Sequence, residues 1–277
     1  MYEARPMRLI AGFILLLGVL TPAGLQAEPL GKQVSDNVAS RLSGDDFNPI
    51  LTLGRERIVL SKELLRFYEE QQYNPVWISA RGPREQARTF LETLRSASRQ
   101  GLCPEDYHVR FIEELLQLST EASRYRLLLQ VRHFVDLEML LTDAFLRYID
   151  HMTTGRVDPD AVMKGWHTQP RRIDAVRLLR YALTTDQMEE FLGKMLPPHR
   201  GFQALKENLW RLRRISAHGG WPRLPQGRSL LRGDSGKSVR LLNRRLQLGD
   251  DLFMDLGETF TDMTRAGVIR FQHRHGL

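Results

Sequence analysis

The chain has 277 residues, of which 42% are hydrophobic and 26% are charged. This balance is typical of a globular protein with one or two domains and excludes a chain that is disordered throughout. The formal net charge of +7 favours an anionic polymer or a membrane surface as partner. The single cysteine, Cys103, excludes an internal disulfide, so the hydrophobic core must stabilise the fold.

The first 27 residues have the pattern of a secretory signal peptide. Arg5 and Arg8 precede an apolar run at residues 9–20, and a segment rich in small residues ends at Ala27, where cleavage is expected. The alternative is an uncleaved anchor in the inner membrane formed by residues 9–20, although a spanning helix needs roughly 20 residues. Both interpretations place the remaining chain outside the cytoplasm, which argues against nucleic acid as a partner.

The next segments predict a series of helices. Residues 28–57 are polar and predict a loose lead-in, a loosely structured segment without recognisable catalytic or binding residues. Apolar residues at spacings of three and four then predict a helix capped by Ser61, a second from Pro83 to Gly101, and a third after residue 108.

The longest periodic segment covers residues 125–159 and predicts a long core helix with one apolar face. Gly155 is expected to end this helix, and Asp158-Pro159 to begin the next one. The apolar face consists of Leu127, Leu128, Val131, Phe134, Val135, Leu141, Phe145, Tyr148, Ile149 and Met152. The opposite face is expected to contact water through Arg132, Asp136, Arg147 and Asp150.

The C-terminal part predicts three helices, a boundary and a small unit. The helices are expected at residues 173–183, 188–196 and 202–215, and the glycines and proline of residues 219–222 predict a domain junction. Two short amphipathic segments follow, and they are too small to bury much surface alone. The predicted fold class is therefore mainly α, with a multi-helix domain at residues 28–222 and a small domain at residues 228–277.

The sequence predicts no catalytic residue, no metal site and no cofactor. Cys103 lies between Leu102 and Pro104 without the basic neighbours that activate a thiolate, so it is interpreted as a turn residue. The histidines are scattered, and His273 and His275 face different sides of a helix. Residues 233–236 are interpreted as a helix-opening turn, with Asp234 or Ser235 as its cap.

Several spaced motifs resemble one family. Residues 64–82, 94–108 and 140–159, with the GGWP element at 219–222, are similar to the N-terminal scaffold domain of the large periplasmic murein L,D-transpeptidases, which cross-link peptidoglycan. The resemblance implies a mainly helical scaffold. The family usually has an aspartate before the proline at this position, where this chain has Cys103. The resemblance therefore implies that Cys103 does not correspond to the catalytic cysteine of the family.

Residues 230–251 and 266–277 resemble the small three-helix peptidoglycan-binding domain. Thr264 and Gly267 depart from its pattern, where leucine and alanine are expected, and a glycine inside a helix costs about 1 kcal/mol. The chain ends before the third helix, so the domain is interpreted as truncated. The catalytic domain of the family, with its histidine and Ser-x-Gly-Cys-x-Arg motif, would come after this module.

The resemblance implies the non-catalytic scaffold and peptidoglycan-binding portion of a murein L,D-transpeptidase, involved in cross-linking and cell-wall organisation in the periplasm. The expected partners are peptidoglycan and a missing or separate catalytic domain. The alternatives are a naturally short wall-binding or regulatory protein without enzymatic activity, and a vestigial product. The candidate peptidoglycan-binding residues flank the two C-terminal helices and are Asp234, Arg240, Arg244 and Arg270.

Overall fold

The computed structural model describes residues 29–43, 48–121, 127–157, 162, 173–185, 188–227 and 229–277. The predicted signal peptide and the predicted helix start at Asp158-Pro159 lie outside these residues. Within the described part, the fold is mainly helical, as predicted, with two small two-stranded sheets. No helix in these ranges has both the length and the hydropathy of a membrane span.

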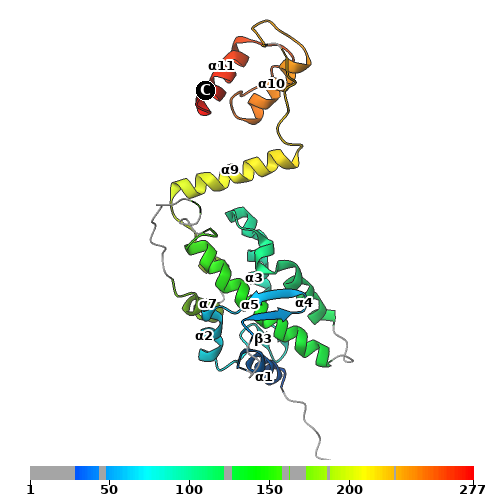
Figure 1. The fold of residues 1–277 in the computed structure, drawn as a ribbon, viewed down its shortest axis with the longest axis vertical. Coiled ribbons are helices and arrows are strands. Elements are labelled where there is room, and N and C mark those ends of the chain that lie inside the picture. The colour runs from blue at the N-terminus through cyan, green and yellow to red at the C-terminus, as the bar shows by residue number, and fades with distance from the viewer. Residues whose placement is uncertain are drawn as a thin grey trace, which may run out of the picture.

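Helix α5 (Leu127–Thr153) forms the centre of the main helical body (Figure 1). Helices α1 (Leu30–Ser43), α2 (Lys62–Glu70), α4 (Val109–Glu121) and α7 (Ala175–Thr184) pack against it. The predicted apolar face is buried from Val131 to Met152, and Gly155 follows the helix with a φ of +92°. The periodicity therefore predicted the buried face from Val131 to Met152, and Gly155 predicted the end of the helix, while the side chains of Leu127 and Leu128 lie outside the described part.

The prediction of a water-facing side of α5 was wrong in part. Arg132 and Asp150 are exposed, but Asp136 is only 2% exposed and forms an ion pair at 2.6 Å with Arg41 of α1. Because α1 covers this side, α5 is enclosed by protein over most of its circumference.

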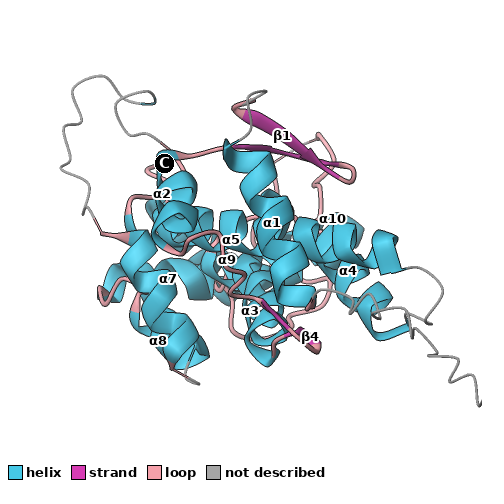
Figure 2. Ribbon diagram, turned by 90° about the horizontal axis from the view of Figure 1, so that it is seen from below, coloured by secondary structure: helices cyan, strands magenta, loops and turns pink. Residues whose placement is uncertain are grey.

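The prediction of a loose lead-in at residues 28–57 was also wrong. Helix α1 buries Val34, Val38 and Leu42, which are spaced four residues apart and lie on one face. An antiparallel hairpin follows, with strands β1 (Ile50–Leu53) and β2 (Glu56–Val59). Figure 2 shows this hairpin at the edge of the helical body.

The predicted helices after residue 60 are present. Ser61 caps α2 by accepting a hydrogen bond from the Leu64 backbone N–H at 3.1 Å. Helix α3 (Glu85–Arg95) begins two residues after Pro83, because Gly82–Pro83 forms strand β4 beside β3 (Ile78–Ser79). The short 3₁₀ helices η1 (Ser96–Gln100) and η2 (Pro104–Tyr107) lead into α4.

The described C-terminal helices are α8 (Met188–Lys194), α9 (Arg200–Ala217), α10 (Lys237–Leu248) and α11 (Asp262–Arg274). The continuous buried core extends from Val34 to Leu192, so α9 lies beyond it. In Figure 1, α9 runs between the helical body and the pair formed by α10 and α11. Gly236 is the N-cap of α10, so the predicted cap at Asp234 or Ser235 was wrong.

The two positions that depart from the peptidoglycan-binding pattern are complementary to their surroundings. Thr264 is fully buried, and its hydroxyl donates a hydrogen bond to Asn243 Oδ1 at 2.9 Å. At Gly267, a Cβ atom would lie 2.9 Å from the carbonyl oxygen of Asp251 and 3.2 Å from Leu246 Cδ1. Glycine therefore permits the close approach of α11 to the preceding loop, and Thr264 joins α11 to α10.

Candidate functional site

A buried carboxylate on α5 holds the segment that precedes α3. Glu138 is fully buried and accepts hydrogen bonds from three consecutive backbone N–H groups: Val76 at 2.8 Å, Trp77 at 2.9 Å and Ile78 at 3.1 Å. Burial raises the pKa of Glu138 to about 7, although the three N–H groups favour the ionised form. The carboxylate thereby supplies acceptors to a bend whose backbone donors would otherwise be unpaired.

The hydroxyl of Thr142, one turn along α5, completes this network. Its oxygen lies 2.9 Å from the Tyr68 hydroxyl and accepts a hydrogen bond from Trp77 Nε1 at 3.1 Å. The Thr142 hydroxyl donates to the Glu138 carbonyl oxygen at 3.0 Å. All four side chains are fully buried. We call Tyr68, Trp77, Glu138 and Thr142 the α5 clamp, because these residues join α2 and the bend at Trp77 to α5.

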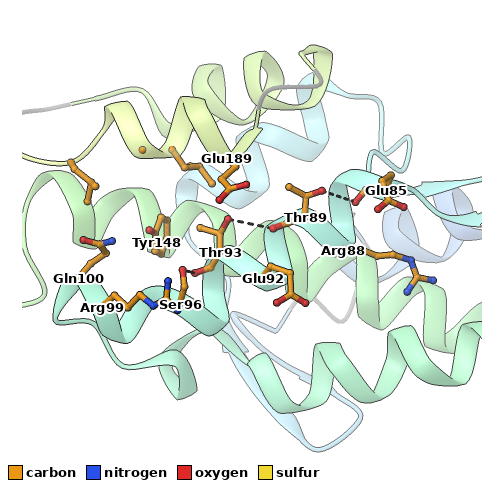
Figure 3. A pocket seen from close by; sticks show the side chains of 13 residues that line it. Glu85, Arg88, Thr89, Glu92, Thr93, Ser96, Arg99, Gln100, Tyr148 and Glu189 are labelled. Atoms are coloured by element: carbon orange, nitrogen blue, oxygen red, sulfur yellow. Dashed lines mark hydrogen bonds between the residues drawn. The ribbon is translucent and has the colours of Figure 1, made fainter. Parts of the chain in front are cut away.

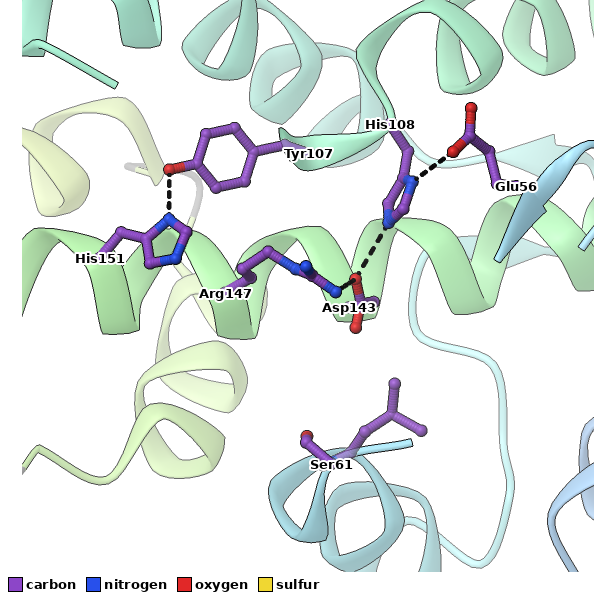
Figure 4. A network of polar contacts seen from close by, with 8 residues as sticks. Glu56, Ser61, Tyr107, His108, Asp143, Arg147 and His151 are labelled. Carbon is purple, nitrogen blue, oxygen red and sulfur yellow. Dashed lines mark hydrogen bonds and ion pairs between the residues drawn. The ribbon is translucent and has the colours of Figure 1, made fainter. Parts of the chain in front are cut away.

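A histidine links the hairpin to the other side of α5 (Figure 4). His108 Nδ1 lies 3.0 Å from Glu56 of β2, and Nε2 lies 3.1 Å from Asp143, which also accepts a hydrogen bond from Arg147 at 2.9 Å. Burial lowers the pKa of His108, but its hydrogen bonds to both carboxylates outweigh this and raise the pKa above the ordinary value. The arrangement favours a charged imidazolium that donates from both nitrogens.

Asp143 and Arg147 also line a pocket of about 600 Å³ together with residues of α2 and α7. The lining includes Ser61 and Asp150, and Figure 4 shows Ser61 below the α5 side chains. Ser61 caps α2 and Asp143 is paired with His108, so these two polar groups serve the fold.

A second pocket, of about 730 Å³, lies between α3, η1 and α8 (Figure 3). Three hydroxyl side chains along its wall donate to main-chain carbonyls of α3: Thr89, Thr93 and Ser96. Its charged lining comprises Glu85, Glu92, Glu189, Arg88 and Arg99. The carboxylates outnumber the guanidinium groups, so this wall is weakly acidic.

Cys103 lacks the surroundings of a nucleophile. Its Sγ donates a hydrogen bond to the Glu105 carboxylate at 3.0 Å, and this contact raises the pKa of the thiol. An activated cysteine requires the opposite environment, in which a positive group stabilises the thiolate. The structure therefore places Cys103 as the residue before η2, in agreement with its interpretation as a turn residue.

A family model for the scaffold domain, the scaffold of L,D-transpeptidases, matches residues 62–209, which is more than half of the chain. The chain belongs to this scaffold-domain family. No curated protein and no solved structure matches the chain significantly. The α5 clamp and His108 lie within the matched scaffold domain, which begins at α2 and ends within α9.

The four residues predicted to bind peptidoglycan lie beyond the matched scaffold domain. Two of them make contacts that order loops. Asp234 accepts a hydrogen bond from the Leu231 backbone N–H at 2.7 Å. Arg270 donates to the Asp251 carbonyl oxygen at 3.0 and 2.6 Å, and its guanidinium lies 5.6 Å from the centre of the Phe253 ring.

The other two predicted residues lie one turn apart on α10 and are exposed. Arg240 forms an ion pair with Glu258 at 3.1 Å, and Arg244 donates to Gln247 at 3.3 Å. Arg244 also lines a pocket of about 310 Å³ with Arg211 and other residues of α9 beyond the scaffold domain's core. The sequence analysis did not predict that basic residues of α9 lie beside Arg244, although the cluster of basic residues at 211–214 is visible in the sequence.

Proposed function

We propose that this chain is a non-catalytic scaffold that holds L,D-transpeptidase activity at the peptidoglycan of the periplasm. The family match over residues 62–209 is the observation that carries the proposal. The α5 clamp supports it, because a fully buried and satisfied hydrogen-bond network rigidifies a domain and uses its polar groups internally. A rigid body of this kind suits the positioning of another domain.

The chemistry of the only cysteine supports a non-catalytic role. The resemblance to murein L,D-transpeptidases implies acyl transfer through a cysteine thiolate. In this chain the hydrogen bond to Glu105 favours the neutral thiol of Cys103. The proposal therefore assigns the thiolate to a catalytic domain, either joined to this chain or separate from it.

Charge and the C-terminal helices support binding to the cell wall. The chain has a net charge of +7 and a sequence pI of about 9.8, and stem peptides of peptidoglycan carry carboxylates. The sequence of α10 and α11 resembles a peptidoglycan-binding domain, and the contacts of Thr264 and Gly267 show that the two helices pack closely. Arg240 and Arg244 present exposed cationic groups on this unit.

Incubating the purified chain with isolated sacculi tests both parts of the proposal. We expect the chain to sediment with the sacculi, and mass spectrometry of the digested sacculi to find no new L,D-cross-links. New cross-links would overturn the non-catalytic role, and a chain left wholly in the supernatant would overturn wall binding. The alternative is a wall-binding or regulatory protein without a transpeptidase partner. It predicts that the purified chain still sediments with sacculi, and that cells lacking the gene have an unchanged content of L,D-cross-links.

A further inference from the structure

Helix α9, within which the matched scaffold domain ends, carries a strongly basic groove. A pocket of about 970 Å³ lies between α9 and η1. Its charged lining comprises Arg99, Lys206, Arg211, Arg213, Arg214 and Glu207. Five basic groups thus face a single carboxylate, whereas the α3–α8 pocket has more carboxylates than arginines. This charge difference selects the α9 pocket as a site for an anionic ligand.

The basic lining continues towards the C-terminal helices. Arg211 and Arg214 also line the pocket of about 310 Å³ that contains His218 and Arg244. Arg211 forms an ion pair with Asp250, which follows α10. We call the two pockets together the α9 groove, because they share Arg211 and Arg214 and their linings include residues of η1, α9 and α10.

Two features of the α9 groove indicate a ligand. The Nε atom of Arg211 is buried and has no hydrogen-bond partner, and the same is true of Gln100 Oε1 in the same lining. A buried polar atom without a partner costs free energy, and each side chain would recover it by turning outward to a bound acceptor or donor. Trp210 is 61% exposed, and Arg214 lies over its ring at 4.7 Å. This geometry holds a flat aromatic surface beside the cationic groups.

We propose that the α9 groove binds a carboxylate-bearing glycan–peptide strand of the kind that peptidoglycan provides, and this inference rests on the proposed function. Guanidinium groups match carboxylates in charge and in their forked geometry. The ring of Trp210 offers an amphipathic face against which a sugar ring packs. Since the groove touches both η1 and α10, a bound strand would contact the scaffold domain and the C-terminal helices together.

The test is co-sedimentation of the full chain with sacculi at several salt concentrations. The groove variant carries Lys206→Glu and Arg214→Glu. The matched control carries Lys194→Glu and Arg200→Glu, which change the net charge equally at exposed positions outside the groove. We expect the groove variant to need about tenfold more sacculi for half-maximal retention, with the control close to the wild type. A third variant, Trp210→Ala, should weaken retention without changing its dependence on salt.

Chemical modification of the sacculi tests the ligand class. Sacculi with carboxylates converted to amides should retain the wild type as weakly as native sacculi retain the groove variant. Vesicles of phosphatidylethanolamine and phosphatidylglycerol test the other anionic surface. If the groove substitutions weakened binding to vesicles more than binding to sacculi, the proposal would be overturned in favour of a membrane as the ligand. Circular dichroism of each variant verifies that the fold is retained.

The outcomes separate this inference from the proposed function. Wild-type retention by a groove variant that is folded would overturn the groove. Loss of retention through Arg240→Glu alone, a residue outside the groove lining, would then place wall binding on α10. Absence of any retention of the wild type would overturn both the groove and wall binding. The scaffold role would then still be tested independently by the L,D-cross-links of cells that lack the gene.

Discussion

Replacing Thr142 by valine tests whether the α5 clamp stabilises the scaffold domain. Valine has nearly the same shape but lacks the oxygen that accepts from Trp77 Nε1 at 3.1 Å and contacts the Tyr68 hydroxyl at 2.9 Å. The Tyr68 hydroxyl still reaches the Glu138 carbonyl oxygen at 3.2 Å, whereas the indole N–H is left without its acceptor in a fully buried site. One unpaired buried donor and one weakened hydrogen bond predict a loss of about 2–3 kcal/mol in the free energy of unfolding.

Urea unfolding followed by circular dichroism measures this loss against two controls. Thr142→Ser keeps the hydroxyl and removes one methyl group, so it should cost about 1 kcal/mol. Thr153→Val removes a hydroxyl that donates only to the Ile149 carbonyl and the Asp150 carbonyl of its own helix, so it should stay within about 0.5 kcal/mol of the wild type. The reasoning would be refuted if Thr142→Val were as stable as Thr153→Val, or if serine were as costly as valine.

Three further predictions concern α11, the hairpin and the cysteine. Gly267→Ala should lower the melting temperature because its Cβ would overlap a backbone carbonyl, whereas Gly201→Ala in α9, which meets nothing within 4 Å, should raise it slightly; stabilisation by both would contradict the packing argument. The folded pKa of His108 is raised, so its contribution to stability is complete below the unfolded pKa of about 6.5 and is lost as pH rises through the folded pKa. The urea midpoint of His108→Gln should therefore depend less on pH over this window than the midpoint of the wild type. An equal pH dependence of the two proteins would exclude His108 as the source. Cys103 should react with iodoacetamide more slowly than an unstructured cysteine peptide at pH 7.5, because its thiol pKa is raised; faster alkylation would indicate an activated thiolate.

The sequence predicted the elements whose evidence is local. The spacing of apolar residues located α5 and its buried face, and Ser61 was recognised as a cap because its partner is three residues away. Helix α1 was missed although Val34, Val38 and Leu42 follow a helical spacing, because its remaining residues are mostly polar and hide a narrow apolar stripe.

The polar network of α5 depends on residues that are distant in sequence. Arg41 lies 95 positions before Asp136, and the backbone donors of Glu138 lie 60 to 62 positions before it. A charged residue within a periodic helix predicts contact with water unless such partners are known. Local patterning therefore assigned Asp136 to the wrong environment.

The sequence analysis treated Gly267 as an unfavourable residue inside a helix, and this interpretation failed for a related reason. A glycine inside a helix is unfavourable by propensity alone, but here the carbonyl oxygen of Asp251 occupies the space that a Cβ would need. Thr264 likewise gains a specific partner in Asn243 on the neighbouring helix. Comparison with a family pattern identified both positions as unusual, and only the packing of α10 against α11 explains them.

The most direct test of the proposed scaffold role is the L,D-cross-link content of sacculi from cells with the gene, without it, and with the gene restored as Cys103→Ala. We predict that deletion lowers the proportion of L,D-cross-links and that the alanine variant restores it fully, because Cys103 supplies no thiolate. An unchanged proportion after deletion would contradict the scaffold role. Failure of a normally expressed Cys103→Ala variant to restore the cross-links would contradict the non-catalytic assignment.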